Sequence, residues 1–258
     1  MTFQPFENLK DGCVVVAGGS GGLGRDIVRK FASVGSNVAF SYLRREQPAQ
    51  KLEREVQAMG VQAFSTRVDL TDVASTETWI AQAEQRFGRI HTVVYASGPL
   101  VTVGPIADLD PAVWAAAVNT DVNGFFNLCH AGIPYLRRSK GSIVALSTAG
   151  IRRYPSLDIT SAGPKAAVEM LVNGITREEG RNGIRANVVA VGQIAAGQGT
   201  DHLQNPRFQR LADKVVQATP LRRMGQPSEI ADAVLFFASS MASFVSGESI
   251  CVDGGGHV

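Results

Sequence analysis

This 258-residue chain has few of the residues that cross-link a fold or attach it to a charged partner. Its three cysteines, Cys13, Cys129 and Cys251, are far apart, form no Cys-x-x-Cys pair and have no histidine-rich neighbourhood. We therefore expect free thiols in a reducing compartment, with neither a disulfide framework nor a bound metal. The net charge of +2 is too small to indicate a nucleic acid or an anionic membrane surface as partner.

Long hydrophobic runs are also missing. No stretch approaches the ~18 unbroken apolar residues that cross a membrane, and the polar residues 1–12 lack the apolar core of a signal peptide. We therefore expect a soluble, cytoplasmic protein. The residues that are present, 45% hydrophobic and 19% charged, are typical of a globular protein, and the length suits one large α/β domain or two small ones.

Short apolar runs alternate with segments of helical period along the chain. Leu23, Ile27 and Phe31 recur at steps of four, as on one face of a helix. The apolar runs cover residues 13–17, 37–42, 62–68, 92–96, 142–147, 185–191 and 249–253. Strands that are apolar on both faces, with amphipathic helices between them, indicate a parallel sheet covered on both sides. We predict a single Rossmann-like, doubly wound α/β domain over residues 1–258, with a seven-stranded parallel sheet.

One segment, residues 192–218, departs from this alternation. It begins with glycines and alanines in an irregular order and then becomes amphipathic. After a predicted strand, such a segment is typical of a mobile lid over a ligand, which is our prediction. An ordinary surface insertion is the alternative.

A glycine-rich turn follows the first predicted strand and leads into the first helix. It holds glycines at positions 18, 19, 21, 22 and 24. Glycine permits positive φ and a close approach of the backbone to a ligand, and the N-terminus of a helix attracts a diphosphate. In this position the turn predicts a dinucleotide-binding site.

The end of the second predicted strand indicates which dinucleotide binds. Folds that bind NAD usually place a carboxylate there for the ribose 2′-hydroxyl, whereas this chain has Arg44 and Arg45 in the segment SYLRRE. Guanidinium groups suit a 2′-phosphate, because they form bidentate, charge-assisted hydrogen bonds. We therefore favour NADP(H) over NAD(H); the alternative is a solvated arginine pair at the start of a surface helix.

Five segments occur in the order found in a known family. They are Gly18-x-x-x-Gly22-x-Gly24, Asp69-Leu70, 88–98 (GRIHTVVYASG), 220–239 (PLRRMGQPSEIADAVLFFAS) and 245–256 (VSGESICVDGGG). Over essentially its whole length the chain resembles the classical short-chain dehydrogenase/reductase family. The resemblance implies an oxidoreductase that uses a nicotinamide cofactor and assembles as a homotetramer or homodimer.

The resemblance also assigns cofactor contacts to residues of this chain. They are Gly18, Ser20, Gly21, Gly22, Leu23, Gly24, Tyr42, Arg44, Arg45, Asp69, Leu70, Ala96, Ser97, Gly98, Lys165, Gly192 and Ile194. Among them, the pair Asp69-Leu70 is expected at the adenine and Ile194 at the nicotinamide carboxamide.

The resemblance breaks at the catalytic residues. The family uses an asparagine, a serine, a tyrosine and a lysine, with the tyrosine four residues before the lysine. If Lys165 is that lysine, the other three positions hold Asp121, Thr148 and Ser161. A serine is a much weaker acid than a phenol, so Ser161 does not simply replace the tyrosine, whereas Thr148 still offers a hydrogen bond to a substrate oxygen. Asp121 is expected to pair with Lys165 and to reduce its effective charge.

The segment around Lys165 also resembles the divergent enoyl-thioester reductases of the same superfamily. Those enzymes place a tyrosine seven residues before the lysine, where this chain has Asp158, and can carry another eleven before it, which matches Tyr154. A carboxylate near an ammonium stays ionised, so Asp158 is a poor acid and Tyr154 becomes the candidate proton donor. Packing of Tyr154 on the sheet edge is the alternative. Pro164 indicates a helix that begins late or bends just before Lys165.

Three functions are compatible with these residues. We favour an NADP(H)-dependent oxidoreductase that transfers hydride to a carbonyl or an activated C=C bond of a small, mostly apolar substrate. A cofactor-binding protein without hydride transfer is the second reading, because Asp121, Thr148 and Ser161 all depart from the family pattern. The third is a scaffold used for isomerisation or elimination, with Asp121 or Asp158 as the base.

Overall fold

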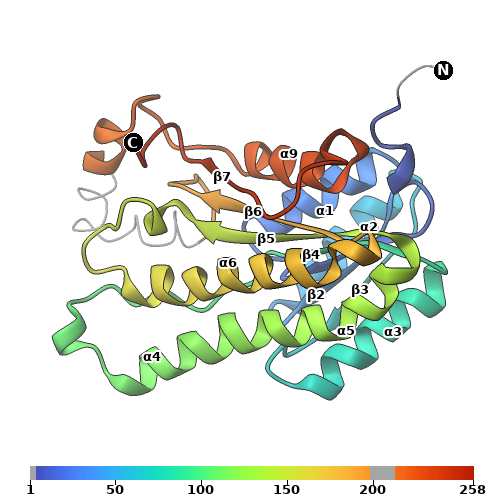
Figure 1. Ribbon diagram of the computed structural model, residues 1–258, viewed down its shortest axis with the longest axis horizontal. Helices are drawn as coiled ribbons and strands as arrows, with labels where there is room; N and C mark the ends of the chain where they lie inside the picture. The colour runs from blue at the N-terminus through green and yellow to red at the C-terminus, as the bar shows by residue number, and fades with distance from the viewer. Residues whose placement is uncertain (1–3, 198–212) are drawn as a thin grey trace.

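The computed structural model describes residues 4–197 and 213–258. Within these residues, seven strands form one parallel sheet in the order β3-β2-β1-β4-β5-β6-β7 (Figure 1). The strands are β1 (Cys13–Ala17), β2 (Asn37–Tyr42), β3 (Ala63–Arg67), β4 (Ile90–Tyr95), β5 (Ser142–Thr148), β6 (Arg185–Val191) and β7 (Ser249–Val252). Each strand covers most of one predicted apolar run, which confirms the single, doubly wound α/β domain.

Helices connect the strands and lie on both sides of the sheet. They are α1 (Gly24–Ser33), α2 (Glu46–Gln57), α3 (Val73–Phe87), α4 (Pro111–Val118), α5 (Gly124–Ser139), α6 (Ile159–Glu179) and α9 (Pro227–Ala238). Single turns of 3₁₀-helix cover Glu7–Leu9, Ile106–Asp108, Ala149–Ile151, Gly180–Asn182 and Ser240–Ala242. None of the helices in the described ranges is both long and apolar enough to cross a membrane.

Local signals at the helix ends explain where several of these helices start and stop. The carboxylate of Asp72 caps α3 by accepting a hydrogen bond from the backbone N–H of Ser75, and Gly88, with φ at 72°, ends it. A π-helix over Asn119–Asn123 joins α4 directly to α5. Such wide turns are often found at functional sites, and this one contains a predicted site residue, Asp121.

Helix α6, which carries Lys165, begins earlier than Pro164 predicts. It runs from Ile159 to Glu179, with Asp158 as its N-cap residue and Pro164 inside it. Near the N-terminal end of a helix, a proline removes only one intrahelical donor, here the one that would bond to the carbonyl of Thr160. The prediction of a late start is therefore wrong.

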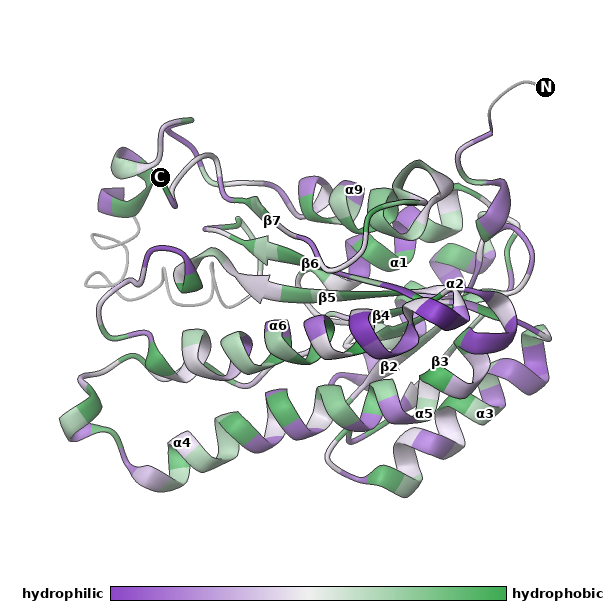
Figure 2. Cartoon of the chain, in the orientation of Figure 1, coloured by the Kyte–Doolittle hydropathy of each residue, from purple (hydrophilic) through white to green (hydrophobic). Residues whose placement is uncertain are grey.

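Two apolar cores cover the two faces of the sheet. On one face α1, α2 and α9 contribute Phe31, Leu52 and Leu235, and on the other α3 and α5 contribute Trp79 and Leu128, together with apolar residues of α6. Figure 1 shows α1 and α9 on one side of the strands and α5 and α6 on the other. In Figure 2 green segments, the colour of hydrophobic residues, alternate with purple ones along the helices, as expected for helices with one face on the core. Burial on both faces explains why the strands are continuous apolar runs.

The direction of strand order reverses at β1, because β2 and β4 lie on either side of it. Val15 of β1, for example, pairs with Ala39 of β2 and with Val93 of β4. In open parallel sheets, ligands bind outside the carboxyl ends of the strands at such a reversal. The segments that follow β1, β4, β5 and β6 meet at this edge, and they contain most of the predicted site residues.

Candidate active site

The glycine turn after β1 packs too tightly for side chains. Gly18 has φ at 75°, and a Cβ atom on it would lie 2.9 Å from the carbonyl oxygen of Ala96. A Cβ on Gly24 would collide with the carbonyl of Gly18, and one on Gly22 would lie 2.7 Å from the Cα of Gly197. Helix α1 begins at Gly24 without a side-chain cap, and the N–H groups of Arg25 and Asp26 donate to backbone carbonyls of the turn, so the helix offers an anion mainly the positive end of its dipole. The remaining predicted members of the turn are half-buried: Ser20, Gly21 and Leu23.

The predicted adenosine contacts follow the neighbouring strands β2 and β3. Arg44 and Arg45 come directly after β2 and are exposed. Asp69 comes after β3, and one oxygen of its carboxylate accepts hydrogen bonds from the backbone N–H and the hydroxyl of Thr71, at 2.9 and 2.7 Å. Leu70 is buried. These residues therefore lie at the carboxyl edge of the sheet, in the half of the sheet that contains β2 and β3.

Glu46 is a residue of this region that the sequence analysis missed. Tyr42, the last residue of β2, has its pKa raised by burial and then by the neighbouring carboxylate of Glu46. Glu46 lies in the first turn of α2, where the helix dipole favours a negative charge. Glu53 also raises the pKa of Tyr42 and Arg67 lowers it, so charges of both signs surround the end of β2.

A buried ion pair occupies the part of the site beyond β4. The ammonium nitrogen of Lys165 lies 2.9 Å from Oδ1 of Asp121, and the two side chains are 12% and 0% exposed. The hydroxyl of Tyr95 donates to the same Oδ1 at 2.7 Å, and the ammonium lies 4.7 Å from the centre of the Tyr95 ring. The structure therefore confirms the predicted pairing of Asp121 with Lys165 and adds Tyr95 to it.

Burial and charge together keep Tyr95 protonated. Burial, and then the charge of Asp121, raise the pKa of the Tyr95 phenol well above its usual range. Tyr95 is fully buried at the end of β4, so its hydroxyl serves Asp121 rather than a substrate. The sequence held one signal of this role, because Tyr95 stands in YASG, where the resembled family ends its strand with Asn-Asn-Ala-Gly.

One oxygen of the buried carboxylate has no partner. Oδ2 of Asp121 is inaccessible and has no hydrogen-bond partner among the residues that the structure describes. A Cβ atom on Gly98 would lie 3.6 Å from both Oδ1 of Asp121 and the nitrogen of Lys165, in ordinary contact. An unpaired buried oxygen is costly, and the ion pair with Lys165 offsets part of the cost of burying this carboxylate.

Ser97 connects the ion pair to the glycine turn. The Lys165 ammonium donates to the carbonyl oxygen of Ser97 at 3.2 Å. The backbone of the same residue lies under the turn, because a Cβ on Gly18 would be 2.9 Å from the Cα of Ser97. The site for a diphosphate and the buried ammonium therefore share one residue of the segment after β4.

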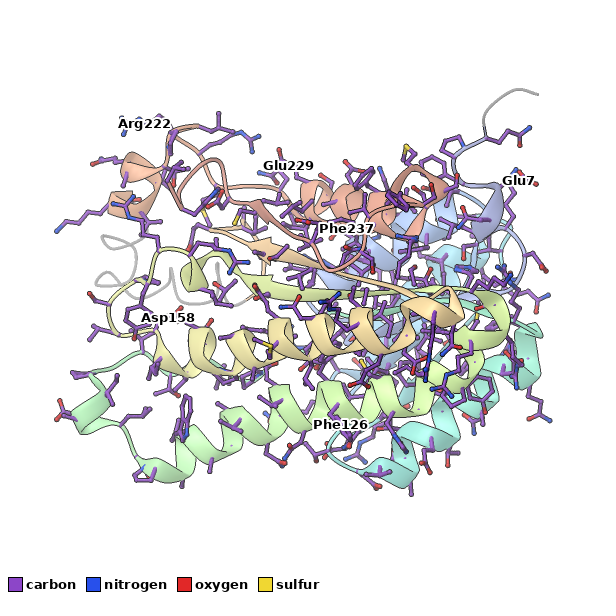
Figure 3. The ribbon with its side chains drawn as sticks, in the orientation of Figure 1. Glu7, Phe126, Asp158, Arg222, Glu229 and Phe237 are labelled. Atoms are coloured by element: carbon purple, nitrogen blue, oxygen red, sulfur yellow. The ribbon has the colours of Figure 1, made fainter. Side chains whose placement is uncertain are left out.

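The first turn of α6 holds a second polar pair, formed by Asp158 and Ser161. Burial raises the pKa of the Asp158 carboxyl to about 6, and the hydrogen bond from Ser161 lowers it by a smaller amount. Figure 3 labels Asp158 at the start of α6. The expected influence of an ammonium on Asp158 is absent, because Lys165 is paired with Asp121, and burial instead raises the pKa, so that a minor fraction of the carboxyl is protonated near neutral pH. Ser161 precedes Lys165 by one helical turn, so the two share a face of α6.

Thr148 and Tyr154 are not brought together. Thr148 ends β5, and its hydroxyl oxygen accepts a hydrogen bond from the N–H of Gly150 at 3.1 Å. Tyr154 is 49% exposed beyond the following 3₁₀ turn. Within the described part of the chain, no hydrogen bond or ring contact joins Tyr154 to Thr148 or Lys165. The predicted proton donor thus lies at the rim of the site.

The segment after β6 is described only as far as residue 197. The N–H of Gly192 donates to the carbonyl of Val252 at 3.1 Å. Ile194 bridges to Gly225, and its side chain is 5% exposed within an apolar core. Its side chain therefore packs inward. Most of the predicted lid at 192–218 lies outside the described residues, so the lid stays a prediction.

Comparison with known sequences shows similarity along nearly the whole chain. Residues 17–257 match the family model described as Enoyl-(Acyl carrier protein) reductase. The 7alpha-hydroxysteroid dehydrogenase of Escherichia coli (strain K12) is 32% identical over 256 residues, which cover 97% of this chain and 96% of that protein. The L-rhamnose 1-dehydrogenase (NAD(P)(+)) of Sphingomonas sp. (strain SKA58) is 29% identical over 252 residues, which cover 97% and 98% of the two chains.

Comparison with solved structures gives the same result. A short-chain type dehydrogenase/reductase from Mycobacterium ulcerans has a TM-score of 0.90 at 25% identity, covering 96% of this chain and 90% of that one. A 7 alpha-hydroxysteroid dehydrogenase in complex with NADH and 7-oxo glycochenodeoxycholic acid has a TM-score of 0.86 at 30% identity, covering 96% and 94%.

Proposed function

This chain belongs to the short-chain dehydrogenase/reductase family of oxidoreductases, and on that premise we propose that it transfers hydride between NADP(H) and a small apolar substrate. The reacting group is a carbonyl or an activated C=C bond. One observation carries the proposal: Ser97 lies against Gly18 of the glycine turn and also accepts a hydrogen bond from the ammonium of Lys165. A cation is thus held next to the place where the backbone is shaped for a diphosphate.

The residues of the turn fit a nicotinamide dinucleotide. Side chains at Gly18, Gly22 or Gly24 would fill the backbone cradle, and the uncapped N-terminus of α1 is suited to a diphosphate. Arg44 and Arg45 support a 2′-phosphate, whereas Glu46 and the NADH-bound relative make NAD(H) the alternative to be tested. When bound, the nicotinamide supplies or accepts the hydride.

Lys165 serves mainly as a binding residue in this proposal. In the resembled family the lysine holds a sugar hydroxyl and also favours ionisation of a neighbouring tyrosine. Here Asp121, at 2.9 Å, neutralises much of the ammonium's charge and fixes its position. The effect on a neighbouring acid is therefore reduced, and the ammonium keeps its hydrogen-bonding role.

The Asp158–Ser161 pair takes over proton transfer in this proposal. A carboxyl group with a pKa of about 6 can be protonated near neutral pH, unlike an ordinary aspartate. As hydride arrives, Ser161 gives its hydroxyl proton to the substrate oxygen and receives the proton of Asp158. Thr148 donates a second hydrogen bond to that oxygen. The same donors stabilise the enolate oxygen formed when a conjugated C=C bond is reduced. Tyr154 remains the alternative donor, and its 49% exposure means that it must move inward to act.

Two measurements test the proposed function. NADPH and NADH are first titrated into the protein, with cofactor fluorescence and calorimetry as readouts. Ketones, quinones and enoyl thioesters are then screened for loss of the nicotinamide absorbance. We expect binding of NADPH and turnover of at least one class; in an active protein, Ser161→Ala should reduce turnover more than Tyr154→Phe. The reverse order would move the proton donor to Tyr154.

A second candidate function rests on the same carboxyl group. A half-buried Asp158 with a raised pKa is also suited to act as a base in isomerisation or elimination. Such a reaction would change the substrate without a net change in the nicotinamide absorbance. Nucleotide binding with neither turnover nor isomerisation would instead support a cofactor-binding protein without enzymatic activity.

A further inference from the structure

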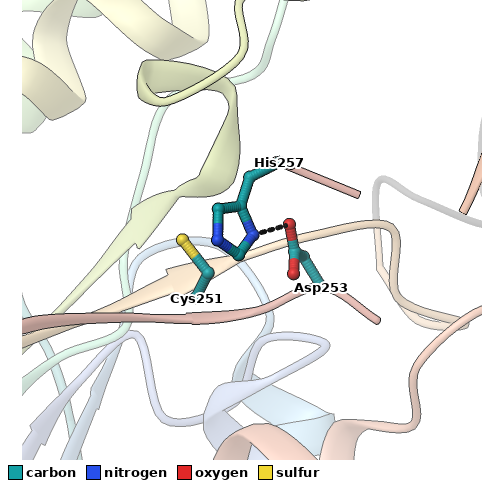
Figure 4. Close-up of side chains that lie close together, drawn as sticks. All are labelled: Cys251, Asp253 and His257. Atoms are coloured by element: carbon teal, nitrogen blue, oxygen red, sulfur yellow. Dashed lines mark hydrogen bonds and ion pairs between the residues drawn. The ribbon is translucent and has the colours of Figure 1, made fainter. Parts of the chain in front are cut away.

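We propose that Cys251, Asp253 and His257 form a zinc-binding site at the end of β7. Figure 4 shows the three side chains facing one another, with the sulfur of Cys251 beside the ring of His257. Their ligand atoms all lie within 4.8 Å of one another. The proposal is independent of hydride transfer, and it replaces our expectation of no metal, which considered only the spacing of the cysteines and the sequence around them.

The chain around these residues is held in place before any metal binds. Cys251 and Asp253 are two residues apart along an extended chain, so their side chains point to the same side. Gly254 and Gly255, with φ at 66° and 84°, then turn the chain back. As a result Nδ1 of His257 lies 2.8 Å from Oδ2 of Asp253.

Two further hydrogen bonds stabilise this turn. The N–H of Gly255 donates to the other oxygen of Asp253 at 3.0 Å. Beyond His257, the guanidinium of Arg153 donates to the carbonyl oxygen of Val258 at 3.1 Å. Cys251 thus belongs to β7, and Asp253 and His257 to a hydrogen-bonded turn that follows it, which reduces the ordering that a metal ion must impose.

The chemistry of the donors selects the metal. A thiolate, an imidazole and a carboxylate are the three kinds of side chain that bind zinc, and the soft sulfur disfavours magnesium and calcium. In the metal-free protein, two of the proposed ligands, His257 and Asp253, are joined to each other by a hydrogen bond. A bound ion replaces that hydrogen bond and leaves a fourth tetrahedral position to water.

The charges around the site favour a divalent cation. Besides Asp253, the charged side chains near Cys251 are those of Glu169 and Arg152. Glu169 and Arg152 form an ion pair at 2.7 Å, so their charges largely cancel. With Cys251 as a thiolate, the remaining charge is that of two anionic ligands, which one Zn²⁺ neutralises. Binding therefore releases the thiol proton.

The test uses the full-length protein after treatment with a chelator. Zn²⁺ is titrated by calorimetry in two buffers of different ionisation enthalpy, and Co²⁺ is added as a spectroscopic substitute. We expect one Zn²⁺ per chain, release of about one proton, a thiolate-to-cobalt charge-transfer band, and no binding of Mg²⁺. Saturating Zn²⁺ should also raise the melting temperature, because it binds the folded state.

Variants assign the site to these residues. Cys251→Ser and His257→Ala should each weaken Zn²⁺ binding by at least about 100-fold, and Cys251→Ser should remove the cobalt band. His130→Ala, which changes an exposed histidine of α5, is the matched control and should bind like the wild type. Circular dichroism checks that all variants are folded. Absence of Zn²⁺ binding, or equal binding by the wild type and both site variants, would overturn the proposal.

Discussion

The glycine turn and the Lys165 pocket lie at the same edge of the sheet and share Ser97, yet they are built in opposite ways. The turn works because side chains are absent, so that backbone N–H groups can approach an anion. The pocket works through buried charges, with Lys165 and Asp121 at 2.9 Å and Tyr95 bonded to the same carboxylate. A site made of backbone N–H groups presents the same hydrogen-bond donors whichever residues carry them. In a pocket made of charged side chains, one substitution changes the charges and the donors that a substrate meets. This difference explains how a chain of this family could keep the glycine turn even if its pocket residues differ, as the sequence analysis predicts.

Removal of one charge from the pocket should have the largest effect. Lys165→Met leaves the carboxylate of Asp121 buried without its counter-charge, and we expect the free energy of unfolding to fall by about 3–5 kcal/mol. Urea denaturation measures the change. The double variant Lys165→Met/Asp121→Asn removes both charges and should recover most of the loss. A double variant no more stable than the single one would show that the ion pair is not what holds the pocket.

A methyl group in the glycine turn should have the next largest effect. Gly18→Ala combines a positive φ with a Cβ that lies 2.9 Å from the carbonyl of Ala96, and should cost about 2–3 kcal/mol of stability. Gly88→Ala is the control, because φ is 72° there and nothing lies within 4 Å. It should cost about 1 kcal/mol. Denaturation of both variants gives the comparison, and NADPH affinity should fall only in Gly18→Ala. Equal losses of stability would mean that crowding at Gly18 is unimportant.

The Asp158 carboxyl should make stability depend on pH in a direction opposite to that of an ordinary aspartate. Its pKa is raised from 3.8 to about 6 in the folded protein. The unfolded state therefore loses this proton first, and the free energy of unfolding should fall by about 2 kcal/mol, allowing for partial solvent screening, as the pH rises from 4 to above 6.

Asp158→Asn keeps the shape of the N-cap residue and removes its titration. The free energy of unfolding of the wild type minus that of the variant should then decrease with pH by the full amount expected for Asp158. Denaturation between pH 4 and 7 measures it. A difference that does not change with pH would show that Asp158 titrates normally, and would remove it as a proton donor.

A single arginine at the adenosine end should have the smallest effect. Arg44→Ala removes a cation near the predicted 2′-phosphate, so the dissociation constant of NADPH should rise about tenfold while that of NADH stays unchanged. Arg54→Ala, an exposed arginine of α2, is the matched control. Fluorescence titration gives both constants. Equal weakening of the two nucleotides by Arg44→Ala would contradict the preference for NADP(H).

The features best predicted from the sequence are those that follow from a recognisable pattern of residue types along the chain. The seven strands, the glycine turn and the pairing of Asp121 with Lys165 were predicted from apolar runs, from glycine spacing and from the position of a carboxylate in the family pattern. The sequence did not predict the effect of burial on Asp158, whose pKa is raised to about 6. It also missed Glu46, which the fold brings next to Tyr42.

The sequence by itself determined the doubly wound sheet and the backbone cradle of the turn, because hydrophobic periodicity and glycine act locally along the chain. Only the tertiary structure decided which charges are buried, which third group joins them and which are left to titrate. Tyr95, Asp121 and Lys165 come from three separate elements, and the energy of a charge depends on its surroundings in space. The same reason applies to Cys251 and His257, whose side chains meet only because the turn after β7 folds back.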